Sequence, residues 1–206
     1  MPSVSSSAIR VRPQQQRSTE RLNSVLAAAA DLFVDLGYEA TTMTAIAERS
    51  GSSIGGLYNY FPDKQSIAIT LRNQYAKELE AHWKPIMDNA GSIGLTTFVD
   101  HFVNHLTDFV REHPAFPKLQ AAAIAVPRDA AARKASRVLI ANAFRAQNSA
   151  LSPEQALLAA SVTLHMVRGM MTLYEEADIM ARPAALAEFK KALSLYIANA
   201  LHGQER

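Results

Sequence analysis

The sequence predicts an all-α protein of about nine helices, and three observations favour this fold class. Apolar residues recur at three- and four-residue spacing along nearly the whole chain. Strand-like alternation is nearly absent, and no segment repeats at a fixed period. Glycine and proline are sparse, and several of them mark the ends of the periodic segments. A chain of 206 residues has room for a small head and a larger body.

Three helices are expected in the first third of the chain, over residues 17–36, 43–50 and 54–61. Thr42 and Ser53 can cap the second and third of these, because a hydroxyl at that position accepts a hydrogen bond from a backbone N–H. Gly37 and Gly51 suit the left-handed backbone just past a helix end, and Pro62 ends the third helix.

Six helices are expected in the remainder, over residues 63–90, 95–113, 117–126, 128–150, 153–176 and 184–201. Pro85 lies inside the first of these, so a kink or an early end is expected near Lys84. Ser152, Pro153 and Gln155 form a strong helix start, with a serine cap, a first-turn proline and a glutamine at the capping-box position.

Composition excludes several classes of site. The chain has no cysteine, which removes disulfides, thiolate nucleophiles and cysteine-based metal sites. It shows neither an apolar stretch typical of a signal peptide nor the ~18 uninterrupted apolar residues of a membrane-spanning helix. A cytoplasmic protein with no membrane partner is therefore expected, without a cofactor.

Charge alone does not identify a nucleic-acid binder, because the formal net charge is only +2. However, Arg10, Arg12 and Arg17 precede the first acidic residue within a serine- and glutamine-rich segment. Residues 1–16 are expected to be a flexible basic arm. A solubilising tail and an arm that contacts phosphates both remain open.

Residues 42–61 have the pattern of a helix, a tight turn with glycine, and a second helix. The second of these helices is poor by propensity, since Gly55 and Gly56 each cost about 1 kcal/mol relative to alanine. Glycine there would allow the backbone to approach a phosphate closely. Tyr58 and Tyr60 add hydroxyl donors, and Asn59 can read a base edge, usually adenine. The alternative is that both tyrosines simply pack on a short surface helix.

Residues 29–47, 51–61 and Lys64 closely resemble the DNA-binding signature of the tetracycline-repressor (TetR) family. Ser53, at the start of the recognition helix, is expected among the DNA-binding residues, and the resemblance implies that some residues hold phosphates while others face bases. The phosphate positions are Thr42, Tyr58, Tyr60, Lys64 and the backbone of Gly55, and the base-facing positions are Gly56 and Asn59. The sequence departs from the pattern at Arg49, Ser50 and Ser52, where small apolar residues are usual, so looser packing of the turn is expected.

By the same resemblance, residues 17–63 form a helix-turn-helix DNA-binding domain and residues 64–206 a ligand-binding and dimerisation domain. The expected function is a sequence-specific transcriptional regulator, a homodimeric repressor released from a palindromic operator by a small, largely apolar effector. Two alternatives remain: a small all-α enzyme or carrier, and a DNA-binding protein without a ligand. Ser161 and His165 lie one turn apart and could be a nucleophile and a base, although no catalytic motif accompanies them.

Apolar and histidine side chains of the body are expected to line an effector pocket, with ordinary core packing as the alternative. The expected lining residues are Trp83, Met87, Phe98, His101, Phe102, His105, Leu106, Phe109, Phe116, Phe144, His165, Met166 and Met170. His101, His105 and Asp108 also have metal-chelating spacing, although surface histidines are the commoner explanation, and no metal site is predicted.

The helix over residues 153–176 is apolar on two sides, so it needs a partner on each side. Together with the last helix it predicts a four-helix dimer interface, with a buried core helix in a monomer as the alternative. The expected interface residues are Leu157, Leu164, Val167, Met171, Tyr174, Phe189, Leu193, Tyr196 and Ile197.

Overall fold

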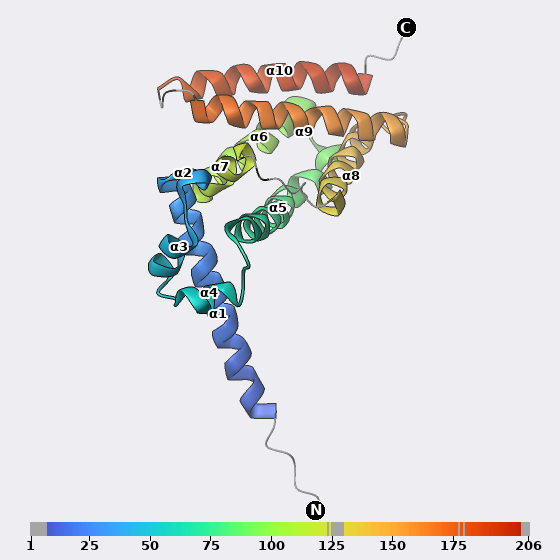
Figure 1. The fold of residues 1–206 in the computed structure, drawn as a ribbon. Helices are drawn as coiled ribbons and strands as arrows, with labels where there is room; N and C mark the ends of the chain where they lie inside the picture. The colour runs from blue at the N-terminus through green and yellow to red at the C-terminus, as the bar shows by residue number, and fades with distance from the viewer. Residues whose placement is uncertain (1–7, 123, 125–129, 177, 179, 203–206) are drawn as a thin grey trace, which may run out of the picture. The chain divides into compact units, whose positions relative to one another are not determined.

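The computed structural model describes residues 8–122, 124, 130–176, 178 and 180–202, apart from the side chains of residues 8–15, 130–133, 174 and 175. Within this part of the chain the protein is all-α, as predicted, with ten α-helices and one 3-10 helix (Figure 1). The elements are α1 (Ala8–Asp35), α2 (Gly37–Ala40), α3 (Met43–Ser50), α4 (Ile54–Tyr58), α5 (Lys64–Asp88), η1 (Ala90–Ser92), α6 (Leu95–Glu112), α7 (Ala115–Ala121), α8 (Ala130–Gln147), α9 (Pro153–Glu176) and α10 (Arg182–His202).

The helices form two compact units, a head that runs to Leu71 and a body formed by most of the chain from Arg72 onward. In the head, α1 packs against α2 and α3, and α3 packs against α4. The first two turns of α5 belong to the head, where Ile67 is fully buried. Phe33 of α1 and Ile46 of α3 are also fully buried, so this small core joins two long helices to α3, which is too short to be stable alone.

Helix ends in the head follow the predicted capping chemistry. The Thr42 hydroxyl accepts a hydrogen bond from Ala45 N–H at 3.1 Å. Gly37 and Gly51 have left-handed backbone angles, with φ of 80° and 68°. Thr41, which is almost fully buried, lies with its hydroxyl 2.8 Å from the Gly37 carbonyl oxygen. These contacts satisfy backbone groups that the helix ends leave free.

Three boundaries in the head differ from the prediction. α1 begins at Ala8, so residues 8–16, expected in the flexible arm, are helical, and residues 1–7 lie outside the described residues. The glutamine and arginine residues of this segment are good helix formers. Its basic charge had suggested a flexible arm instead. The turn after Gly37 is the short helix α2. α4 ends at Tyr58 instead of Phe61, because Pro62 disfavours helical geometry in the residue before it.

The body is built around α9, which packs against α7, α8 and α10. α9 and α10 run side by side in Figure 1, and α10 also packs against α6. An aromatic cluster fills part of the core, with Trp83 stacked on Phe102 at a ring-centroid distance of 4.5 Å. Lys190 Nζ lies 3.0 Å from Asp100 Oδ1 and donates to Asn104 Oδ1 at 2.8 Å, which ties α10 to α6.

The predicted capping box at the start of α9 is confirmed. Ser152 Oγ accepts from Gln155 N–H at 3.2 Å, and Gln155 Oε1 accepts from Ser152 N–H at 2.9 Å. An early end of α5 near Lys84 was wrong, because α5 continues through Pro85 to Asp88. Ile86 is buried, and this packing offsets the backbone hydrogen bond that proline removes.

Other boundaries in the body shift by a few residues. α6 ends before Pro114 as predicted, and α7 starts two residues before and ends five residues before the predicted 117–126. α8 and α10 keep their predicted positions with ends displaced by one to three residues. Such shifts are normal because helix ends depend on local caps more than on apolar periodicity.

By length and composition, the segment Pro153–Leu173 of α9 is the one described helix that could cross a membrane, with a mean hydropathy of 1.4. The sequence prediction did not find it because it required an uninterrupted apolar run, which Ser161, His165 and Arg168 break. A core helix passes the same test of length and composition, and α9 packs against neighbouring helices on its inner side.

Gly37→Ala should lower the free energy of unfolding by about 1 kcal/mol, because an L side chain is strained at φ 80° although space is available there. Urea unfolding followed by circular dichroism measures the change. Gly55→Ala is the matched control, since Gly55 also faces open space but lacks a positive φ. The control should be neutral or stabilising. Equal destabilisation by both changes would contradict the backbone explanation.

Candidate nucleic-acid interface and ligand cavity

α4 presents one face to the core of the head and the other to solvent. Leu57 is fully buried and Phe61, just past the helix, is 5% exposed, so the prediction that both point inward is confirmed. The outer side carries residues that the sequence predicted as DNA contacts. Ser53, Gly55, Tyr58 and Asn59 are all exposed, and so is Ile54, which sequence reasoning missed. The apolar anchors therefore fix which side chains of α4 a partner can reach.

The two glycines of α4 differ in whether the protein itself leaves room for a side chain. A Cβ on Gly56 would lie 2.9 Å from Ser53 Oγ, the atom that caps α4 by accepting from Gly56 N–H at 3.1 Å. Gly55, in contrast, has no atom within 4 Å of the position of a Cβ. Nothing in the described head requires glycine at position 55, whereas close approach of an external surface would.

A groove of about 480 Å³ lies beside the start of α4, between α1 and the turn after α3. Arg17 and Arg21 line it from α1, one helical turn apart, together with one carboxylate, Glu20. Ser52 and Tyr60 line its other side. Sequence reasoning grouped Arg17 with the basic residues Arg10 and Arg12 and missed Arg21, although the four-residue spacing of Arg17 and Arg21 on a helix would have placed them on one face.

Three of the predicted phosphate-binding residues already make contacts within the head. Thr42 Oγ1 serves as the cap of α3 and keeps its hydroxyl hydrogen for another partner. The Tyr60 hydroxyl lies 3.2 Å from Ser18 Oγ. Lys64 Nζ donates to the carbonyl oxygens of Tyr38 at 2.6 Å and Glu39 at 2.9 Å. Lys64 therefore stabilises the end of α2 in the DNA-free protein.

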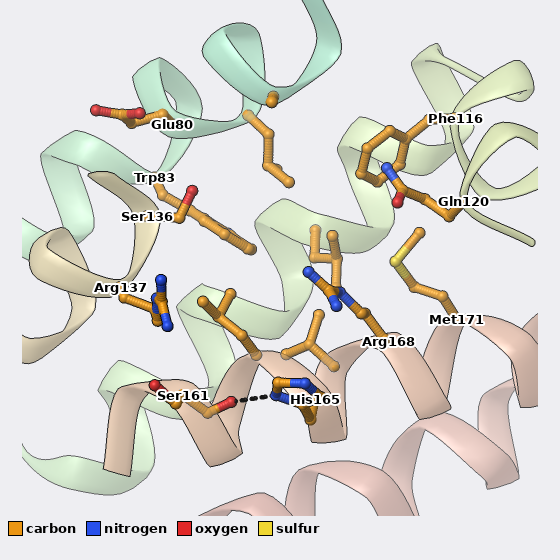
Figure 2. Close-up of a pocket in the computed structure, with 15 residues that line it drawn as sticks. Glu80, Trp83, Phe116, Gln120, Ser136, Arg137, Ser161, His165, Arg168 and Met171 are labelled. Carbon is orange, nitrogen blue, oxygen red and sulfur yellow. Dashed lines mark hydrogen bonds between the residues drawn. The ribbon is translucent and has the colours of Figure 1, made fainter. Parts of the chain in front are cut away.

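The body contains a cavity of about 420 Å³ between α5, α6, α7, α8 and α9 (Figure 2). Four residues predicted for the pocket line it: Trp83, Leu106, Phe116 and His165. A DNA-binding protein without a ligand has no need of such a cavity, so its presence counts against that alternative.

The other residues predicted for the pocket do not line this cavity. Six are buried core side chains: Met87, Phe98, Phe102, Phe109, Phe144 and Met170. Three further residues, His101, His105 and Met166, also lie off its lining. Helical periodicity identifies which side chains point inward, but ring-to-ring packing decides where space is left. Phe98 and Phe102, for example, stack with centroids 6.2 Å apart and fill their own space.

Polar residues that sequence reasoning missed share the cavity with apolar ones. Arg137 and Ser136 come from α8, Arg168 from α9, Gln120 from α7 and Glu80 from α5 (Figure 2). Their sequence signal is weak, because charged residues on amphipathic helices are expected to face water. Only the arrangement of the helices brings them to the border of one partly open cavity, where Arg137 is exposed and the other four are half-buried.

The geometry of Ser161 and His165 does not support a nucleophile–base pair. His165 Nδ1 lies 2.7 Å from the backbone oxygen of Ser161, as the dashed line in Figure 2 marks. The Ser161 hydroxyl donates instead to Leu157 O at 2.8 Å, within its own helix. The enzyme alternative loses the one residue pair that suggested it.

The histidines of α6 form no metal site with their neighbours. The His105 ring lies 4.8 Å from the ring of His82, between centroids. Burial, and then the proximity of His82, lower the pKa of His105, which favours its neutral form. Among the described residues, no group of three His, Cys, Asp or Glu side chains is placed to hold a metal ion.

The predicted dimer interface is only partly on the surface. Leu193 and Ile197 are fully buried within the protomer, and Leu164, Val167 and Met171 line the cavity, so these five side chains are directed into the protomer. Leu157 is exposed, Phe189 and Tyr196 are half-buried, and the side chain of Tyr174 lies outside the described residues. The inward stripe of α9 was thus taken for the outward one.

Further exposed apolar residues, outside the predicted interface, lie on the outer side of α9 and on α10. Leu158 is 68% exposed, Leu173 is 50% exposed and Leu195 is 65% exposed. A Cβ on Gly169, between Leu158 and Leu173 on α9, would meet no atom within 4 Å. We call Leu158, Val162, Gly169, Leu173 and Leu195 the outer apolar face.

Comparison with known proteins gives matches in both units. Residues 25–71 match the sequence profile of bacterial regulatory proteins of the tetR family, and residues 95–196 match that of a tetracyclin repressor-like C-terminal domain. Together the two profiles span most of the chain.

Individual relatives align with only part of this chain. The HTH-type transcriptional repressor KstR2 of Mycolicibacterium smegmatis is 32% identical over 80 residues, 39% of this chain and 38% of that protein. The HTH-type transcriptional regulator QacR of Staphylococcus aureus is 34% identical over 62 residues, 30% of this chain and 33% of that protein. The alignments span little more than a third of these relatives.

The fold extends the similarity to nearly the full length. The structure of a TetR-family transcriptional regulator from Mesorhizobium loti superposes with a TM-score of 0.62 at 20% identity, covering 90% of this chain and 96% of that one. At this identity the likeness shows the fold alone.

Lys64→Met should destabilise the head by about 1–2 kcal/mol even without DNA, because two carbonyl oxygens at the end of α2 lose a charged donor. Thermal unfolding of the free protein measures this. Lys84→Met is the control, since Lys84 makes only an exposed ion pair with Asp88 on its own helix. If the two variants unfold at the same temperature, Lys64 has no structural role in the head.

Proposed function

Because the chain belongs to the TetR family of bacterial regulatory proteins, we propose that it is a DNA-binding transcriptional regulator that acts in the cytoplasm. The observation that carries this proposal is the outer side of α4, where Tyr58 and Asn59 are exposed while Leu57 anchors the helix from beneath. A rigid helix with exposed polar and aromatic side chains is suited to the major groove of DNA.

In this proposal the exposed residues on and around α4 contact different parts of the DNA. Asn59 makes paired hydrogen bonds with adenine, and Ile54 contacts a thymine methyl group. Thr42 and Tyr58 donate their hydroxyl hydrogens to phosphates. Arg17 and Arg21, from the groove on α1, add charge that attracts the DNA backbone without reading its sequence.

We further propose that the protein acts as a homodimer through its outer apolar face. Exposed leucines on two adjacent helices are costly in water unless a second copy covers them. A two-fold dimer carries two copies of α4 and therefore matches a palindromic operator with half-site centres about 34–36 Å apart.

The cavity supports regulation by a small molecule, which would release the repressor from its operator. One continuous helix, α5, carries Lys64 of the head at its first residue and Trp83 of the cavity wall near its end. A ligand that favours one position of α5 over another would change the population of DNA-binding states by the difference in its affinity for them.

Selection from a random duplex pool should return an inverted repeat. Asn59→Ala should then weaken binding by about 1–3 kcal/mol and relax the preference at one position in each half-site. Arg21→Gln should weaken binding to all sequences and make it less dependent on salt, because one phosphate contact per protomer is lost. Fluorescence anisotropy at several salt concentrations measures both. Unchanged affinity and salt dependence in both variants would rule out this mode of DNA binding.

Leu158→Glu combined with Leu195→Glu should convert the dimer into a monomer, because carboxylates would be buried against one another across the outer apolar face. Analytical ultracentrifugation measures the mass. Leu36→Glu is the matched control, as Leu36 is an exposed leucine of the head at 53% and should leave the dimer intact. A dimer that survives the double change would place the interface elsewhere.

A further inference from the structure

The lining of the body cavity carries an excess of positive charge. Arg137 and Arg168 approach it from two different helices, and Glu80 is the one carboxylate among the lining residues. In Figure 2 the Arg168 side chain reaches from α9 toward the middle of the lining residues, whereas Glu80 lies at their edge on α5. A cavity built only for an apolar molecule gains nothing from two guanidinium groups.

A third cation, Arg72, lies close to Arg168. Burial lowers the pKa of the Arg72 guanidinium, and the positive charge of Arg168 lowers it further. Arg72 Nε is buried and has no hydrogen-bond partner among the described residues. Like charges held together in a partly dry site repel one another, and an anion placed among them would reduce that cost.

Guanidinium groups are well suited to hold an anionic head group. Each has five N–H donors in a planar fork that matches the oxygens of a carboxylate or a phosphate. Bonds that Arg137 and Arg168 make within the protein therefore still leave donors for a ligand. Because the two side chains come from α8 and α9, a bound anion would also join these two helices.

A second polar feature of the cavity is an acceptor without a donor. Gln120 Oε1 is buried and has no hydrogen-bond partner in the described part of the chain, yet Gln120 lines the cavity. A buried acceptor that lacks a partner costs free energy, so such an atom is usually satisfied by something bound. A hydroxyl or amide N–H on the ligand would satisfy it.

Much of the remaining lining is apolar and includes Leu79, Trp83, Leu106 and Phe116, although Ser136, Ser161 and His165 also border the cavity. The volume of about 420 Å³ lies within the range of sites that enclose small organic molecules, and it exceeds what an inorganic ion needs. The cavity is therefore amphipathic, with an apolar part and a cationic part.

We propose that the ligand of this cavity is an amphipathic organic anion, whose apolar body packs on Trp83 and Phe116 and whose carboxylate or phosphate is held by Arg137 and Arg168. The cationic part revises the expectation of a largely apolar effector. An effect of this anion on DNA affinity rests on the proposed function as a DNA-binding regulator. Binding of the anion does not depend on that function and can be tested without DNA.

Two fluorescent probes that share one aromatic skeleton and differ by one anionic group test the proposal on the intact protein. Anilinonaphthalene sulfonate carries an anionic group, and N-phenyl-1-naphthylamine is its neutral counterpart. Trp83 is the single tryptophan of the chain and lines the cavity, so a probe bound at this site accepts energy from it, and the arginine variants below distinguish this site from the outer apolar face. We expect one sulfonate probe per protomer, bound about tenfold more tightly than the neutral probe.

Arg137→Gln and Arg168→Gln should each weaken the sulfonate probe about tenfold and change the neutral probe less than twofold. Retained binding of the neutral probe shows that the cavity is still folded. Arg111→Gln is the matched control, because Arg111 pairs with Asp108 on the exposed side of α6 and should alter neither probe. If neither arginine change alters the affinity of the sulfonate probe, or if that probe gives no energy transfer from Trp83, the proposal is wrong.

Competition identifies the head group. Decanoate and decyl phosphate should displace the sulfonate probe, the better one showing which oxyanion the arginines prefer, and decanol should displace it at least tenfold less well. Equal displacement by decanol would overturn the anionic site. The operator DNA obtained by selection separates this result from the proposed function. If the anion binds as expected but DNA affinity does not change, the anion site stands and control of DNA binding by the ligand fails.

Discussion

The division of the apolar surface of α9 between two faces is the constraint on which the body depends. The inner face, with Val167 and Met171, closes against neighbouring helices and around the cavity. The outer face keeps Leu158 and Leu173 in solvent. A helix with more apolar surface than one protomer can cover can contribute both to a ligand cavity and to the contact with a second copy of the chain. Both proposals for the body follow from this one imbalance.

The head solves a different physical problem, because it must present a very short helix in a fixed orientation. Five residues of helix are unstable alone, so α4 depends on the Ser53 cap at one end and on the burial of Leu57 and Phe61 at the other. Lys64 adds a charged donor that holds the end of α2. The residues that could meet DNA are thus positioned by residues that never touch it.

Sequence reasoning was accurate in the head and less so in the body, and particular residues show why. Caps act over three residues, so Thr42, Ser53 and Ser152 could be recognised from local pattern alone. Phe98 and Trp83 looked equivalent in sequence, but one fills the core and the other borders a cavity. Arg168 was missed because its helix, not its own sequence neighbours, turns it inward.

The sequence by itself determined the helical class, most helix positions, the capping of the head and the inward orientation of Leu57 and Phe61. These features depend on interactions between residues a few positions apart, and such interactions can be predicted from the local sequence. Only the tertiary structure decided which stripe of α9 faces inward, where the cavity lies and which charges border it. Those features depend on how helices distant in sequence pack together, and apolar periodicity cannot distinguish one buried face from another.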